Sequence, residues 1–173
     1  MDAMPRASLE FYLPDSGATE VLGQSLARTF LGSEAPGAVV YLQGELGAGK
    51  TACVRSFLRA LGITGLVRSP TYTLVETYTV GSLTCVHVDL YRLKSLTEVD
   101  ELGLRDAVEP QCLLVEWPEK GEGALPPADL HVLLDYAGEG RRARLSAATP
   151  LAATWLEKLG YDTSLIPYVS NLT

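Results

Sequence analysis

The chain reads Gly44-Glu45-Leu46-Gly47-Ala48-Gly49-Lys50-Thr51 at residues 44–51, and this stretch decides its fold. The glycines in the spacing G-x-x-x-x-G-K-T let backbone N–H groups turn toward phosphate oxygens. Residues 38–42 before it form a short apolar run typical of a buried strand. Residues 51–61 after it have the pattern of a helix that stops at Gly62. Strand, glycine loop and helix in this order predict a loop that binds a nucleoside triphosphate.

The residue types at the end of this loop give it specific chemistry. Lys50 is expected to reach the β- and γ-phosphates, and the Thr51 hydroxyl to coordinate Mg²⁺. The helix N-terminus adds partial positive charge. A chance match in a glycine-rich chain is the alternative, and the fitting elements on both sides of the loop argue against it.

Length and composition favour one domain with a full core. The 173 residues are 47% hydrophobic, which excludes a disordered chain. No run approaches the roughly 18 apolar residues of a membrane span, and the first residues do not resemble a signal peptide. Cys53, Cys85 and Cys112 are predicted to be buried and reduced, and to form neither disulfides nor a zinc site. We therefore expect a soluble cytoplasmic protein.

The charge is acidic, with a formal net charge of −7. Proteins that bind nucleic acid unaided usually carry a basic face. The densest basic segment here is only Arg141-Arg142-x-Arg144. If the function involves RNA, a partner is expected to provide most of the contact.

The remaining pattern predicts an α/β fold. It is P-loop NTPase-like, a mixed sheet with a parallel core, antiparallel additions and flanking helices. The domain core is expected over about residues 9–160, and residues 161–173 are expected to be loosely held. The expected elements are a helix over 17–31 capped by Asp15 or Ser16, strands over 72–80 and 83–89 joined at Gly81-Ser82, a short helix from Ser95 to about Leu102, a parallel strand over 112–115, a hairpin of 130–136 with 141–147, and a helix from Thr149-Pro150 to Gly160.

Two acids stand at the ends of predicted strands, Asp89 after residues 85–88 and Glu116 after residues 112–115. Ligands of open α/β sheets bind beyond the carboxyl ends of the strands. One or both acids should hold Mg²⁺, directly or through water, or orient a water for attack. The alternative is that each acid only caps a loop.

Other candidates are less specific. Thr71, in Ser69-Pro70-Thr71, could sense a γ-phosphate as switch loops do, or belong to a simple turn before a strand. Trp117 is open to three interpretations: core packing, the nucleotide site or a partner surface. His87 and His131 lie within strand patterns and are interpreted as structural.

Four blocks in series resemble the bacterial TsaE (YjeE) family over about residues 9–147. They are Gly-Glu-Leu-Gly-Ala-Gly-Lys-Thr (44–51), Ser-Pro-Thr-Tyr-Thr-Leu-Val-Glu (69–76), His-Val-Asp-Leu-Tyr-Arg-Leu (87–93) and Leu-Val-Glu-Trp-Pro-Glu-Lys-Gly (114–121). The first block is generic, whereas the other three are specific. The resemblance implies a small ATPase needed to form threonylcarbamoyladenosine in ANN-decoding tRNAs. It also implies that the ATPase works with the TsaD–TsaB heterodimer and meets tRNA only through that complex.

The resemblance also implies roles for individual residues. Those expected to bind ATP or ADP are Gly47, Ala48, Gly49, Lys50, Thr51, Thr71, Ser16 near the adenine, and Arg141 in preference to Arg144. Thr51 and Glu116 would hold Mg²⁺, and the catalytic residues would be Lys50, Asp89 and Glu116. Ala52 departs from a second Thr common after the loop, and no motif matches the tail from Leu151.

Three other functions compete with the ATPase. A small-molecule P-loop kinase would usually carry an Arg-bearing lid, and residues 118–123 contain no Arg. A GTPase would need an Asn/Thr-Lys-x-Asp motif, which the sequence lacks. A nucleotide-gated interaction module would bind ATP with little turnover unless a partner completed its site.

Overall fold

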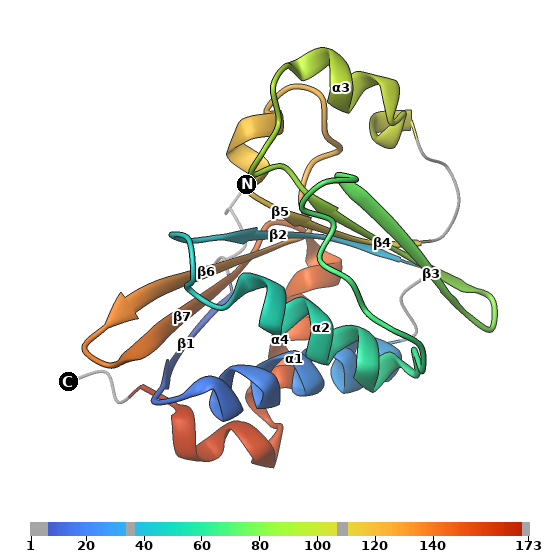
Figure 1. Ribbon diagram of the computed structural model, residues 1–173. Helices are drawn as coiled ribbons and strands as arrows, with labels where there is room; N and C mark the ends of the chain where they lie inside the picture. Colours follow the sequence, from blue (N-terminus) through green and yellow to red (C-terminus); the bar gives the residue numbers. More distant parts are fainter. Residues whose placement is uncertain (1–6, 34–36, 107–110, 171–173) are drawn as a thin grey trace, which may run out of the picture.

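A computed structural model describes residues 7–33, 37–106 and 111–170. They form one seven-stranded sheet in the order β1-β7-β6-β2-β5-β4-β3 (Figure 1). The central strand β2 runs parallel to β5 and β6, and β5 runs parallel to β4, whereas β1, β7 and β3 are added antiparallel. This mixed sheet with a parallel core is the predicted fold class. The strands are β1 (Ser8–Leu13), β2 (Ala38–Gln43), β3 (Val75–Val80), β4 (Leu83–Asp89), β5 (Gln111–Glu116), β6 (Leu130–Ala137) and β7 (Gly140–Ala147).

Helices cover both faces of the sheet, with the larger core on one of them. Helices α1, α2 and α4 pack on one face, and α3 with the short η2 lies over the other, beside β4 and β5 (Figure 1). The helices are α1 (Ser16–Leu31), α2 (Lys50–Leu61), α3 (Leu96–Glu101) and α4 (Pro150–Gly160), with 3₁₀ turns η1 (Leu104–Asp106), η2 (Pro118–Gly121) and η3 (Thr163–Tyr168). Among the helices of the described residues, none is long and apolar enough to cross a membrane.

Close packing of α1 on α2 sets the position of the phosphate-loop helix. A Cβ atom at Gly23 of α1 would lie 2.0 Å from Ser56 Oγ and 2.5 Å from Cys53 O of α2, so the two backbones meet where only glycine fits. The side chain of Asp15 accepts a hydrogen bond from Ala18 N at 2.9 Å. Asp15, and not Ser16, is therefore the N-cap of α1, which leaves the Ser16 hydroxyl available.

Two segments differ from the predicted elements. Strand β3 begins at Val75 and not at residue 72, because Leu74 has φ +65° and its N–H closes a turn on Pro70 O at 2.8 Å. In α3 the capping box does not form: the Ser95 side chain caps no N–H, and Glu98 accepts from Lys94 N at 3.1 Å. Because β3 begins late, residues 71–74 form an irregular segment beside the carboxyl end of β4.

The end of the chain is packed more closely than expected. Between Asp162 and Ser170 it forms η3, buries Leu165 against the core, and lies against β1 through Ser170 N to Glu10 O at 3.2 Å. Asp162 also pairs with Arg28 at 3.1 Å. Residues 171–173 of the predicted loose tail lie outside the described residues. Residues 162–168 show no helical or strand period from which this packing could be predicted.

Candidate functional site

The loop between β2 and α2 has the backbone geometry of a phosphate cradle. Gly44, Gly47 and Gly49 have φ values of +144°, +80° and +110°, which L side chains rarely adopt. A Cβ atom at Gly44 would lie 2.2 Å from Leu134 O on β6, so the sheet itself fixes the start of the loop. The loop runs directly into the N-terminus of α2, where backbone N–H groups and the helix dipole favour an anion. Backbone and helix terminus together fit a phosphate group.

Lys50 is the first residue of α2 and is almost fully buried at the loop. Its Nζ donates to Gly44 O at 2.5 Å and to Glu45 O at 2.8 Å, and lies 4.3 Å from the ring centroid of Trp117. Burial lowers the pKa of Lys50 below its ordinary value, against the opposing charges of Glu116, Asp89 and Glu119. A cation fixed within the loop by backbone carbonyls is suited to contact phosphate oxygens.

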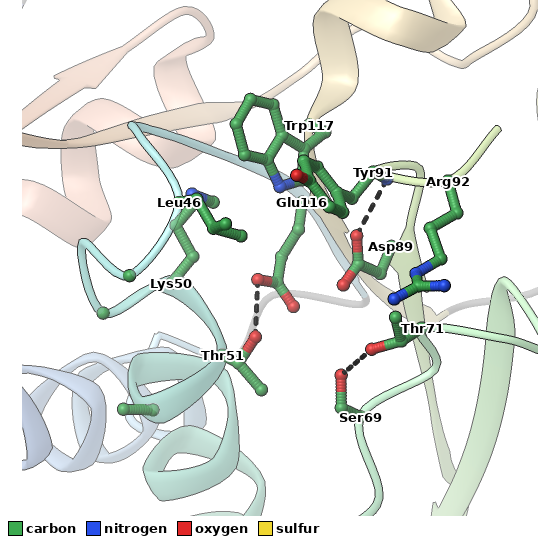
Figure 2. Close-up of a pocket in the computed structure, with 13 residues that line it drawn as sticks. Leu46, Lys50, Thr51, Ser69, Thr71, Asp89, Tyr91, Arg92, Glu116 and Trp117 are labelled. Carbon is green, nitrogen blue, oxygen red and sulfur yellow. Dashed lines mark hydrogen bonds between the residues drawn. The ribbon is translucent and has the colours of Figure 1, made fainter.

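The two predicted Mg²⁺ ligands are in direct contact. Thr51 Oγ1 donates a hydrogen bond to Glu116 Oε1 at 2.8 Å (Figure 2). The other carboxylate oxygen, Oε2, lies 2.6 Å from Nε2 of His87. A hydroxyl and a carboxylate beside a phosphate cradle are the protein donors that Mg²⁺ takes in P-loop proteins. The described residues contain no cluster of three or more His, Cys, Asp or Glu side chains that could hold a metal by itself. A cation here would therefore depend on phosphates for further ligands.

Asp89 lies beside Glu116 because the parallel register of β4 and β5 pairs these two residues. Its Oδ1 accepts a hydrogen bond from Tyr91 N at 3.0 Å. Burial raises the pKa of Asp89, and the negative charge of Glu116 raises it further, against the Tyr91 N–H and the charges of His87 and Lys50. The acid faces the cavity in front of Thr51, where it can orient a water or a metal-bound group (Figure 2).

A cavity of about 480 Å³ lies in front of these residues. The irregular segment before β3 supplies Ser69 and Thr71, whose hydroxyls are 2.7 Å apart and face Asp89 across the cavity (Figure 2). Trp117, with φ +58°, packs its ring 5.1 Å from that of Tyr91 and lines the cavity wall. The structure supports two of the three interpretations of Trp117, since it packs against the smaller core cluster and also lines this cavity. A contact with a partner stays a prediction.

A second hollow of about 260 Å³ lies on the other side of the loop. The start of α1 supplies Ser16 to it, the loop supplies Ala48, and the first turn-proximal residues of β7 supply Arg141. Arg141 donates to Gly47 O at 3.3 Å and stacks 4.1 Å from the Tyr136 ring centroid. Arg144 points elsewhere and lies 3.7 Å from Glu10. Of the two arginines, Arg141 is thus the one at the loop.

The structure brings together every residue predicted for the site, in two groups around one loop. Leu46, Tyr91 and Arg92 also line the larger cavity and were not predicted, and His87 contacts the site from the core. Arg92 lines the larger cavity, with its guanidinium 4.8 Å from the exposed ring of Tyr72. His87, interpreted as structural, contacts Glu116. His87 and Arg92 both belong to the block of residues 87–93 that carries part of the family resemblance. Their closeness to Asp89 in the sequence is the signal from which they could have been predicted. His131, in contrast, packs edge-on against Tyr41 with ring centroids 5.6 Å apart.

Cys53, Cys85 and Cys112 are buried and free, as predicted. Cys85 and Cys112 face each other across β4 and β5. All three belong to the larger core cluster, and none lines either hollow. Their part in the site is therefore packing.

Comparisons with known proteins identify the family. A family model described as "Threonylcarbamoyl adenosine biosynthesis protein TsaE" matches residues 13–144. Two proteins named tRNA threonylcarbamoyladenosine biosynthesis protein TsaE are similar to this chain. That of Haemophilus influenzae is 42% identical over 83% of this chain and 92% of its own. That of Synechocystis is 43% identical over 68% of this chain and 74% of its own. A crystal structure of Bacillus subtilis YdiB superposes with a TM-score of 0.71 at 29% identity, covering 91% of this chain and 97% of that one. The chain belongs to the TsaE family of threonylcarbamoyl adenosine biosynthesis proteins.

Proposed function

We propose that this protein is a cytoplasmic ATPase that supports formation of threonylcarbamoyladenosine in ANN-decoding tRNAs. The observation that carries the proposal is the Thr51–Glu116 hydrogen bond at the head of a phosphate cradle, in a chain of this family. The pair would provide two oxygen ligands for Mg²⁺, beside a lysine held in place by backbone carbonyls. P-loop enzymes use these functional groups to position a nucleoside triphosphate.

The two hollows would bind different parts of the nucleotide. The narrower one, with Ser16 and Arg141, fits the adenosine end, while the larger one lies beyond the loop where the γ-phosphate would emerge. Lys50 and the loop amides would hold the β- and γ-phosphates. Thr51 and Glu116 would hold Mg²⁺, and its positive charge would offset the negative charge of the phosphates.

Hydrolysis requires a water aligned with the γ-phosphate. Asp89 is placed to accept a hydrogen bond from that water, since its carboxylate faces the cavity next to Glu116. Thr71 stands across the cavity on an irregular segment that contacts β4 through Asp89 N to Leu74 O at 2.9 Å. Such a segment can respond to the γ-phosphate, as switch loops do. Family membership favours this reaction over transfer to a small-molecule acceptor, the kinase alternative.

The proposal predicts that tRNA modification depends on nucleotide binding by this chain. Cells depleted of the protein should accumulate ANN-decoding tRNAs that lack threonylcarbamoyladenosine, and wild-type protein should restore it. The Lys50→Ala variant should not restore it, because the charge on the phosphates is gone, whereas the exposed-surface variant Lys94→Ala should. Mass spectrometry of tRNA nucleosides measures the result. An unchanged level of the modified nucleoside after depletion would contradict the proposed pathway.

We further propose that the chain acts through the TsaD–TsaB heterodimer. Its net charge of −7 disfavours direct binding to the negatively charged tRNA, so we expect a partner to provide the contact with tRNA. Nucleotide state should control docking, because a nucleotide shifts an equilibrium only if it binds the two states with different affinity. Sedimentation with the heterodimer should show different affinities for the ATP-, ADP- and nucleotide-free forms. Equal affinities would exclude the switch.

A further inference from the structure

A buried histidine, His87, contacts the carboxylate of the proposed metal ligand Glu116. His87 is 1% exposed and Glu116 is 2% exposed, and the distance between Nε2 and Oε2 is 2.6 Å. The other oxygen of the same carboxylate accepts from the Thr51 hydroxyl at 2.8 Å. Both oxygens of Glu116 therefore have a fixed partner, one on β4 and one on α2. The carboxylate lies between them with its remaining lone pairs toward the cavity.

The contacts of the imidazole define its hydrogen positions. An ionised carboxylate only accepts hydrogen bonds, so Nε2 must carry the hydrogen. Nδ1 is the one buried side-chain polar atom among the described residues that has no hydrogen-bond partner. The contacts therefore fit an imidazole that donates from Nε2 to Glu116.

We propose that His87 is a positioning residue that fixes Glu116 for a nucleotide-bound Mg²⁺. The inference rests on the proposed function, since it assigns His87 a task only if Thr51 and Glu116 serve a metal. A ring donor on β4 suits this task because it fixes the direction of the carboxylate from the side opposite Thr51. A residue present only to fill the core would be apolar at this place, as Cys85 and Leu114 are on the same face of β4 and β5. Groups that form a hydrogen bond with a metal ligand commonly set the orientation and the basicity of that ligand.

Two conservative variants separate positioning from packing. In His87→Gln the side-chain amide can reach the place of Nε2, whereas in His87→Asn it reaches only the place of Nδ1. Calorimetry would measure ADP binding without metal, and then Mg²⁺ binding to the protein–ADP complex. We expect His87→Asn to weaken Mg²⁺ binding about 10- to 100-fold, the usual loss when a partner of a metal ligand is removed. His87→Gln should stay close to wild type, and metal-free ADP affinity should be the same in all three proteins.

Several outcomes would overturn the inference. Equal Mg²⁺ affinity in wild type and His87→Asn would do so, as would an equal loss in both variants or a parallel loss of metal-free ADP affinity. Should a variant fail to fold, ¹⁵N NMR of the wild-type imidazole decides: the inference requires a hydrogen on Nε2, and an Nε2 without one overturns it. A wild-type protein that binds neither ADP nor Mg²⁺·ADP would instead overturn the proposed function, and this inference with it.

Discussion

The Lys50→Ala variant is expected to lose most binding of Mg·ATP and nearly all hydrolysis. Lys50 is the cation fixed inside the loop, and its Nζ is placed by Gly44 O and Glu45 O. Loss of a charged hydrogen bond to a phosphate should weaken ATP binding on the order of 10- to 100-fold. Loss of a preorganised charge at the reacting group should lower hydrolysis on the order of 10²- to 10³-fold.

Calorimetric titration and a phosphate-release assay measure the two effects. Lys94→Ala is the matched control, because it also removes one lysine charge but from an exposed position outside both hollows. GTP provides a second control, since no guanine motif is present and its affinity should be low in wild type as well. A Lys50→Ala protein that melts like wild type and still binds ATP with wild-type affinity would show that the loop has another ligand.

The local part of this site could be predicted from sequence because its signals are local. The Gly-Lys-Thr spacing, the apolar run of β2 and the Gly62 stop of α2 lie within 25 residues and each has its own physical cause. Strand-terminal acids were also predictable, since a parallel core puts carboxyl ends at one edge. The structure adds the register that pairs Asp89 with Glu116.

The rest of the site depends on contacts that sequence spacing does not encode. The His87–Glu116 pair joins residues on two strands and requires knowing that β4 and β5 are neighbours in register. Strand β3 starts late because Leu74 has a left-handed backbone conformation. The alternation of apolar and polar residues continues through Leu74, so the sequence gives no sign of this break. Arg92 lies in a turn, where neither period nor capping indicates which way a side chain points.

The two acids are expected to fail in different ways when neutralised. Asp89→Asn and Glu116→Gln both keep the size of the side chain, and both should lower hydrolysis on the order of 10²- to 10³-fold in the presence of the TsaD–TsaB pair. ADP binding without metal should change little in either, because neither carboxylate lies in the adenosine hollow. Glu157→Gln, an exposed acid on α4, is the matched control.

Mg²⁺ affinity then separates their roles. Glu116 touches Thr51 Oγ1 at 2.8 Å, so Glu116→Gln should raise the Mg²⁺ concentration needed for half-maximal hydrolysis. Asp89 is held by Tyr91 N at 3.0 Å, and Asp89→Asn should lower the maximal rate while that Mg²⁺ concentration stays unchanged. A titration of the rate with Mg²⁺ measures both quantities in one experiment. If both variants hydrolyse ATP at the wild-type rate, the acids are structural caps of β4 and β5; if both show the same shift in Mg²⁺ dependence, they share the metal, and the water must be oriented by another group of the cavity.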